Sequence, residues 1–171
     1  MRLYVASSWR NARQPNVVAR LREVGHEVYD FRHPPGGDHL GFSWSDVDPR
    51  WQEWMPEDYL RGIDHPVAIA GFDSDFGAMQ RADGCVLVLP CGRSAHLEAG
   101  WFVGAEKPLW ILLDRQEWPG GHSTAELMYR MADDVLEDLD ELINAIRSPV
   151  THEEAEEWLR GPRHATGGSD G

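Results

Sequence analysis

The chain contains an unbroken apolar run, ADGCVLVLP at residues 82–90, and this run constrains the fold more than any other feature. The run is rich in Val and Leu and lacks polar alternation, which is typical of a parallel strand buried on both faces of a sheet. A turn (CGRS) follows at once, and residues 96–104 then have the pattern of a short helix with Ser94 as the expected N-cap. A strand that passes directly into a helix favours an α/β fold with a parallel central sheet.

The N-terminal part of the chain repeats this alternation. Residues 2–7 (RLYVAS) predict a first strand, residues 14–24 predict a helix with apolar residues at helical spacing, and residues 26–31 predict a second strand. Right-handed crossovers join such strands in parallel. We therefore expect a single Rossmann-like (flavodoxin-like) α/β domain, with a central parallel sheet of about five strands. Helices flank this sheet, and an order such as 2-1-3-4-5 is expected for its strands.

The other predicted elements extend this domain to about residue 160. We expect short helices at 56–62 and 74–81, a strand at 108–113 (PLWILL), a helix at 123–131, a long amphipathic helix at 132–147 with a solvated acidic face, and a last helix at 151–159. Residues 161–171 have the composition of a disordered tail. The predicted domain therefore covers residues 1–160.

An aromatic-rich insertion at about residues 33–56 breaks the pattern of strands and helices. It begins with PPGGD and then holds Phe42, Trp44, Trp51 and Trp54. Four large aromatic residues within thirteen positions are too many for a freely solvated loop. Two interpretations stay open: the segment folds over a satellite core or a subunit interface, or it forms a wall of the substrate pocket to which Trp44 and Trp51 contribute.

Charge and composition argue against several classes of function. A formal net charge of -13 over 171 residues disfavours binding to nucleic acid polymers, which require a basic face. No run approaches the roughly 18 apolar residues that cross a bilayer, and the N-terminus has no signal-peptide pattern, so we expect a cytoplasmic protein without a membrane partner. The cysteines and histidines show no metal-ligand spacing, and the GxGxxG dinucleotide motif is absent. We therefore expect neither a metal nor a nicotinamide or flavin cofactor.

Two loops are the expected place for a ligand, because open α/β sheets bind ligands beyond the carboxyl ends of their strands. They are residues 7–11 (SSWRN) and residues 90–98 (PCGRSAHLE). If their strands are neighbours, the side chains that converge there are Tyr4, Ser8, Arg10, Arg93, Ser94 and Glu98. A carboxylate among hydroxyls and two guanidinium groups suits an anionic sugar derivative better than a core. Taken alone, Glu98 has another interpretation, which is that it complements the dipole of its helix.

Three short motifs, taken together, resemble a known family. They are LYVASSW near the N-terminus, Asp75 upstream of the AD pair that ends at Asp83, and LEAG with Glu98. Their order and spacing over residues 2–113 resemble the nucleoside 2-deoxyribosyltransferase superfamily, including the 2'-deoxynucleoside 5'-monophosphate N-glycosidases. The resemblance implies that Glu98 is the nucleophile, that Tyr4 orients it, and that Asp75 handles the proton of the nucleobase. Asp73 is the alternative to Asp75.

The resemblance also implies a substrate-binding set. Ser8 and Arg10 match residues that line the sugar and phosphate site of the monophosphate hydrolases. The chain departs from that pattern at Gly92, where those hydrolases usually have a serine, so the phosphate contact is expected to move to Arg93 and Ser94. Members of the family generally assemble, and a homodimer or higher homo-oligomer is therefore expected.

Cleavage of an N-glycosidic bond requires two carboxyl groups with different pKa values, because one stabilises an oxocarbenium-like transition state and the other protonates the leaving base. Glu98, near Arg93 and a helix N-terminus, is expected to stay ionised, and Asp75 is expected to hold a proton. The predicted substrate is a nucleoside or nucleoside 5'-monophosphate, with transfer of the sugar to water or to another base. Two alternatives stay open: a catalytically silent module that binds or senses a nucleotide derivative, and an enzyme that cleaves NAD or acts in cyclic-nucleotide signalling.

Overall fold

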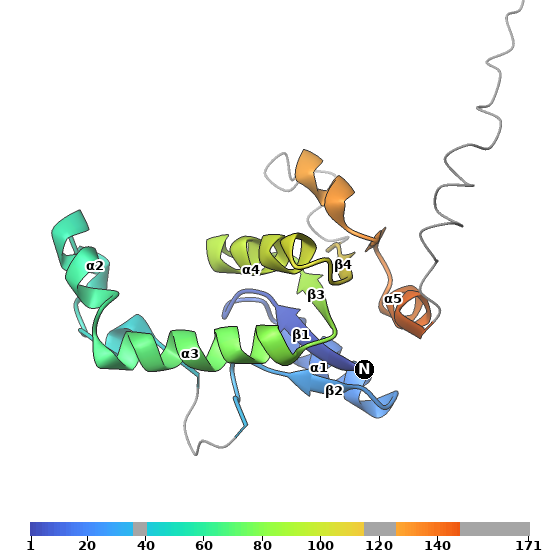
Figure 1. Cartoon of the computed structure of the whole chain (residues 1–171), viewed down its shortest axis with the longest axis horizontal. Coiled ribbons are helices and arrows are strands. Elements are labelled where there is room, and N and C mark those ends of the chain that lie inside the picture. Colours follow the sequence, from blue (N-terminus) through green and yellow to red (C-terminus); the bar gives the residue numbers. More distant parts are fainter. Residues whose placement is uncertain (36–40, 115–125, 148–171) are drawn as a thin grey trace, which may run out of the picture.

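The computed structural model describes residues 1–35, 41–114 and 126–147, and these form a five-stranded parallel sheet flanked by helices (Figure 1). The strands are β1 (Arg2–Ala6), β2 (Glu27–Tyr29), β3 (Gly84–Val88), β4 (Leu109–Leu112) and β5 (Asp134–Leu136). Their order is β2-β1-β3-β4-β5, and every adjacent pair is parallel. The predicted α/β class and strand order are confirmed.

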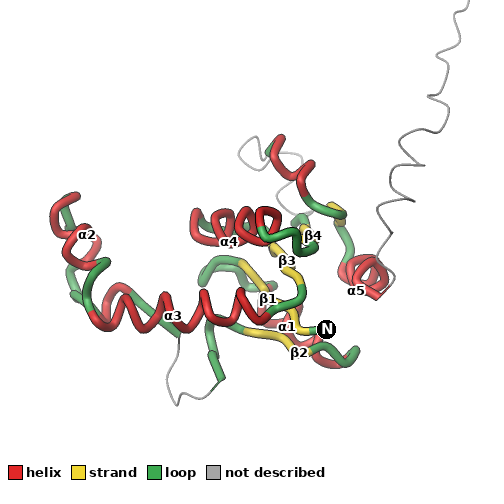
Figure 2. Tube along the Cα trace, in the orientation of Figure 1, coloured by secondary structure: helices red, strands yellow, loops and turns green. Residues whose placement is uncertain are grey.

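Helices cover both faces of the sheet (Figure 2). The helices α1 (Gln14–Glu23) and α5 (Leu139–Arg147) pack on one face, and α3 (Pro66–Arg81) and α4 (Arg93–Gly104) pack on the other. Because side chains alternate along a strand, Leu3 and Val5 of β1 join the first layer, whereas Tyr4 joins the second. Tyr4 therefore shares a layer with the two helices that carry the candidate acids.

Two of these helices begin earlier than predicted. After α2 (Pro56–Gly62), α3 begins at Pro66 rather than near Ser74, so Asp73 and Asp75 lie inside a helix. Its first half exposes apolar side chains, which hides the usual amphipathic pattern. The helix α4 begins at Arg93 with Gly92 as the N-cap, so the predicted cap at Ser94 is wrong, and no side chain caps this helix.

The single long helix predicted at residues 132–147 is wrong. These residues form β5 and then α5, and the Asp138 carboxylate accepts hydrogen bonds from the backbone N–H groups of Asp140 (2.8 Å) and Glu141 (3.1 Å) at the start of the helix. The apolar spacing around Val135 and Leu139 fits both arrangements, so periodicity alone could not separate them. Of the helix predicted at 123–131, the described part forms the 3-10 turn η4 (Leu127–Met131). The helix and tail predicted beyond residue 150 lie outside the described residues.

The aromatic segment forms a satellite cluster with α2, near the outer end of α3 (Figure 1). It contains two 3-10 turns, η1 (Trp44–Asp46) and η2 (Trp51–Glu53). The Trp44 ring packs edge-on against Phe42, Trp54 and Tyr59, with ring centroids 4.9, 5.5 and 5.7 Å apart. Gly62 is required here, since a Cβ at this position would collide with the Trp54 ring. The structure thus supports the satellite-core interpretation for Trp44.

Candidate active site

The β1–α1 and β3–α4 loops meet at the carboxyl edge of the sheet, as predicted. The buried Asn11 amide donates hydrogen bonds to the carbonyl oxygens of Val88 (3.2 Å) and Pro90 (3.1 Å). The Ser7 hydroxyl donates to the same Val88 oxygen at 2.8 Å. These bonds hold the end of β1 against the end of β3.

Arg32, which follows β2, holds the β1–α1 loop from the other side. Its guanidinium donates hydrogen bonds to the carbonyl oxygens of Ser8 (2.9 Å), Trp9 (2.9 Å) and Asn11 (2.8 Å). It also lies over the Trp9 ring, 5.8 Å from the centroid. The backbone around Ser8 is therefore held by the Arg32 side chain, while the loop's own Ser7 and Asn11 side chains anchor the loop to the end of β3.

A pair of carboxyl groups, Asp75 on α3 and Glu98 on α4, occupies the layer that contains Tyr4. Both residues are half-buried, and the charge of each carboxyl acts on the buried Tyr4 hydroxyl. The negative charge of Asp75 also acts on Glu98. By contrast, Asp73 is exposed, so the structure brings Asp75 and not Asp73 into this group.

Two stacked tyrosines lie beside these carboxyls. The rings of Tyr4 and Tyr29 are 5.5 Å apart and inclined by 12°. The Tyr29 hydroxyl donates a hydrogen bond of 2.7 Å to the Asp75 carboxylate. The Tyr4 hydroxyl makes no hydrogen bond within the part of the chain that the structure describes. It nevertheless lies close enough to Glu98 to lower the pKa of that carboxyl. Asp75 is thus hydrogen-bonded to Tyr29, whereas Glu98 lies near the Tyr4 hydroxyl.

The pKa of Glu98 differs from the expectation that this carboxyl stays ionised. Burial, followed by the negative charge of Asp75, raises the pKa of Glu98 to about 7, and the Tyr4 hydroxyl offsets this only in part. Burial also raises the pKa of Asp75, against the hydrogen bond from Tyr29. Arg93 is not among the groups that shift Glu98, so the predicted stabilisation of an ionised Glu98 by Arg93 is wrong for the free protein. Near neutral pH the pair shares its last proton, and Glu98 competes for it.

The predicted phosphate-binding residues lie in the β1–α1 loop and in the first turn of α4. Arg10, Arg93 and Ser94 are exposed, and within residues 1–35, 41–114 and 126–147 the side chains of both arginines make no ion pair or hydrogen bond. The half-buried Ser8 hydroxyl accepts a hydrogen bond from the Arg10 backbone N–H at 3.2 Å. No side chain caps α4 at Gly92, so the helix start presents backbone N–H donors beside Arg93.

The chain's single lysine has a structural position instead. Lys107 donates hydrogen bonds to the carbonyl oxygens of Gln80 (2.8 Å) and Ala82 (2.6 Å) at the end of α3, and lies 5.4 Å from the centre of the Trp101 ring. The Lys107 ammonium group is therefore occupied by contacts within the fold.

The structure does not bring the predicted Trp44 and Trp51 to the carboxyl pair. Trp44 belongs to the satellite cluster, and Trp51 is half-buried in η2. Their part in substrate binding stays a prediction.

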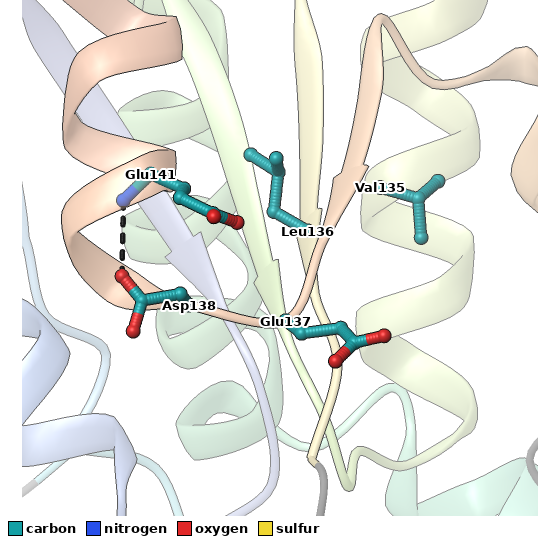
Figure 3. A pocket seen from close by; sticks show the side chains of 5 residues that line it. All are labelled: Val135, Leu136, Glu137, Asp138 and Glu141. Carbon is teal, nitrogen blue, oxygen red and sulfur yellow. Dashed lines mark hydrogen bonds between the residues drawn. The ribbon is translucent and has the colours of Figure 1, made fainter.

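A surface recess of about 520 Å³ lies elsewhere, between β5 and α5 (Figure 3). It is lined by Val135, Leu136, Glu137, Asp138 and Glu141. Asp138 bonds the first turn of α5, as the dashed line shows, and this explains its position without a ligand. The candidate active site is therefore the carboxyl pair and not this recess.

Neither a cluster of metal ligands nor a membrane-spanning helix occurs among residues 1–35, 41–114 and 126–147. No group of three or more His, Cys, Asp or Glu side chains in them is arranged to hold a metal ion. None of their helices is long and apolar enough to cross a membrane.

Sequence reasoning missed three residues that build the site. Tyr29 lies in a predicted strand, where an aromatic residue is usually core, and nothing in the sequence indicated its bond to Asp75. Asn11 belongs to the predicted SSWRN turn, and Arg32 follows the second predicted strand. Buried Asn and half-buried Arg need partners, which is a general signal, but the partners themselves are distant in sequence.

Comparison with known proteins supports the fold. No protein-family model and no curated protein matches the sequence. A 2-deoxyribosyltransferase from Bacillus psychrosaccharolyticus has a similar structure, with a TM-score of 0.53 and 18% identity over 84% of this chain and 91% of that chain. A CMP N-glycosidase from Clostridium botulinum also matches, with a TM-score of 0.44 and 15% identity over 86% of this chain and 99% of that chain. The first match confirms the resemblance at the level of the fold: the chain has the fold of a nucleoside 2-deoxyribosyltransferase.

Proposed function

We propose that this protein cleaves the N-glycosidic bond of a nucleoside or nucleoside 5'-monophosphate through a glycosyl ester on Glu98. The observation that carries the proposal is the pair of half-buried carboxyls with raised pKa values, Glu98 and Asp75, each beside the hydroxyl of one stacked tyrosine. Two such groups from neighbouring helices are costly in a core and are typical of acid–base and nucleophilic chemistry. The fold shared with a 2-deoxyribosyltransferase supports the same class of reaction.

In the proposed reaction, a Glu98 carboxylate oxygen attacks the anomeric carbon of the sugar. The bond from that carbon to the base nitrogen breaks, its electron pair passes to the base, and Asp75 supplies the proton that neutralises the base. Water or a second base then attacks the anomeric carbon, its proton passes to the Asp75 carboxylate, and the ester bond breaks to release the Glu98 carboxylate. The reaction starts from the state in which the two carboxyls hold one proton between them. That proton must be on Asp75, with Glu98 ionised, when the substrate reacts.

Product analysis tests this function. The protein is incubated with a panel of ribo- and deoxynucleosides and their 5'-monophosphates, and free base is measured by chromatography. Release of a base supports the proposal, and addition of a second base separates hydrolysis from transfer. Tight binding without product would favour the silent binding module, and nicotinamide release from NAD alone would favour the NAD-cleaving alternative.

Arg10 and Arg93 are proposed to bind a 5'-phosphate together with Ser94 and the start of α4. Charge-assisted hydrogen bonds of this kind contribute about 1.5–3 kcal/mol each. Arg10→Ala or Arg93→Ala is therefore expected to raise KM for a nucleoside monophosphate by about tenfold or more, and to leave KM for the nucleoside nearly unchanged. Steady-state kinetics on matched substrates measures this, with the exposed Arg50→Ala as control. Equal losses on both substrates would assign these arginines to the fold or to the sugar.

The active unit is proposed to be a homo-oligomer that assembles through an apolar face on α2 and α3. The exposed apolar residues of these two helices and of the residues flanking α2 are Met55, Tyr59, Leu60, Ile63, Val67, Ile69 and Phe72. Exposed apolar residues in this number are more typical of an interface than of free surface. Light scattering is expected to give a multiple of 19.4 kDa, and Leu60→Asp is expected to shift the protein to monomer whereas the exposed Gln52→Asp does not. A monomeric wild-type protein at micromolar concentration would contradict the assembly.

A further inference from the structure

We propose that Tyr29 is a positioning residue, which holds one oxygen of Asp75 so that the other oxygen carries the proton for the leaving base. The effect on turnover rests on the proposed function. The geometry itself does not, because the contact exists in the free protein. Tyr29 lies on β2, whereas Asp75 lies on α3, so the bond between them joins two layers of the fold.

The donors and acceptors around Tyr29 form a chain with one direction. The Tyr29 hydroxyl has a single proton, which it donates to Asp75 Oδ1 at 2.7 Å. The Ser74 hydroxyl lies 3.0 Å from the same Tyr29 oxygen, and it must therefore be the donor in that contact. The hydrogen bonds run from Ser74 through Tyr29 to Asp75, and consecutive hydrogen bonds of this kind strengthen one another.

This chain decides which oxygen of Asp75 is available for chemistry. Oδ1 accepts the Tyr29 proton, so a proton taken up by the carboxyl resides on Oδ2. An acid whose proton occupies one defined oxygen delivers it along one direction, which general acid catalysis requires. Without Tyr29, the two oxygens become equivalent and the carboxyl can rotate.

The ring and the hydroxyl of Tyr29 have separable roles. The ring stacks on Tyr4, at 5.5 Å between centroids, and this contact belongs to packing. The hydroxyl alone contacts Asp75. Tyr29→Phe therefore keeps the packing and removes the positioning, so a structural role and a positioning role predict different results.

The groups that act on Asp75 and Tyr29 come from every element around them. The negative charge of Asp75 acts on Glu98 of α4 and on Tyr4 of β1. The positive charge of Arg81 on α3 acts on Tyr29. None of these is altered by Tyr29→Phe, so a change in the titration of Asp75 would report the lost hydroxyl.

The test is a carbon-13 NMR titration of the Asp and Glu carboxyls in the free protein, with no substrate present. In Tyr29→Phe the titration midpoint of Asp75 is expected to rise by roughly one pH unit, because the ionised carboxylate loses a donor. Ser74→Ala is expected to shift it in the same direction by less, and Tyr59→Phe, which removes a hydroxyl from the distant α2, is expected to leave it unchanged. An unchanged midpoint in Tyr29→Phe would overturn the proposal.

Kinetics supply the second readout once a substrate is found. Tyr29→Phe is expected to lower kcat by about tenfold with KM within twofold of wild type, because the hydroxyl is engaged by Ser74 and Asp75. An equal kcat in Tyr29→Phe and wild type would also overturn the proposal. If the wild-type protein releases no base from any substrate, the proposed function fails, whereas the titration still decides the position of Tyr29.

Discussion

Replacing Glu98 by glutamine is expected to lower kcat by about 10³-fold or more, because the amide cannot form the glycosyl ester. KM should change little, since the side chain keeps its shape. The measurement is the rate of base release under saturating substrate. The matched control is Glu57→Gln, which removes an exposed glutamate from the first turn of α2 and should retain wild-type turnover.

The same Glu98 variant is expected to be more stable than wild type at high pH. The carboxyl titrates near 4.5 in an unfolded chain and near 7 in the folded protein. As pH rises through that window the unfolded chain loses its proton first, so the stability of the wild type falls and stays lower above pH 7. The free energy of unfolding of Glu98→Gln at pH 8 should exceed that of wild type by on the order of 1–3 kcal/mol.

Denaturant unfolding at pH 4 and pH 8 measures this difference. The gap between the two proteins should close at pH 4, where both carry a neutral side chain. A variant that is less stable at pH 8 and keeps high activity per folded molecule would show that Glu98 is structural.

Replacing Asp75 by asparagine is expected to lower kcat by about 10²–10⁴-fold, the range that general acid catalysis contributes. It also removes the negative charge that raises the pKa of Glu98, so that pKa should fall below about 7. For the wild type, the pair loses its last proton as pH rises through about 7, and kcat/KM should decline above that pH. In Asp75→Asn this decline should disappear from the profile.

Asp73→Asn is the matched control for Asp75→Asn. Asp73 is exposed and lies two residues away on the same helix, so its neutralisation should leave both the rate and the pH profile unchanged. A larger loss in Asp73→Asn than in Asp75→Asn would reverse the assignment of the acid.

The sheet and its reactive edge could be predicted because apolar runs and helix periodicity are local signals. The run at residues 82–90 and the β1–α1–β2 pattern fixed the parallel sheet, and with it the two loops that meet through Asn11. The burial of Asp75, as opposed to Asp73, follows from which face of α3 meets the sheet. That face could not be recognised while the helix was expected to begin eight residues late.

The parts that could not be predicted depend on contacts between distant residues. The bond from Tyr29 to Asp75 joins residues 46 positions apart, and no spacing rule relates them. The raised pKa of Glu98 depends on its burial and on the position of Asp75, whereas its neighbours in sequence, Arg93 among them, suggested the opposite. The Trp44 cluster likewise depends on Tyr59 and on the absence of a side chain at Gly62, where the Trp54 ring packs.

The covalent role of Glu98 is tested most directly by mass spectrometry of protein quenched in acid during turnover. We expect the wild-type mass to increase by one glycosyl group, with the added mass on the peptide that contains Glu98. Asp75→Asn, in which the later attack on the ester is also slowed, should accumulate more of it when a substrate with a good leaving base is used. Glu98→Gln should show none. Base release by the wild type without an adduct in either protein, together with undiminished release by Glu98→Gln, would contradict a covalent intermediate on Glu98.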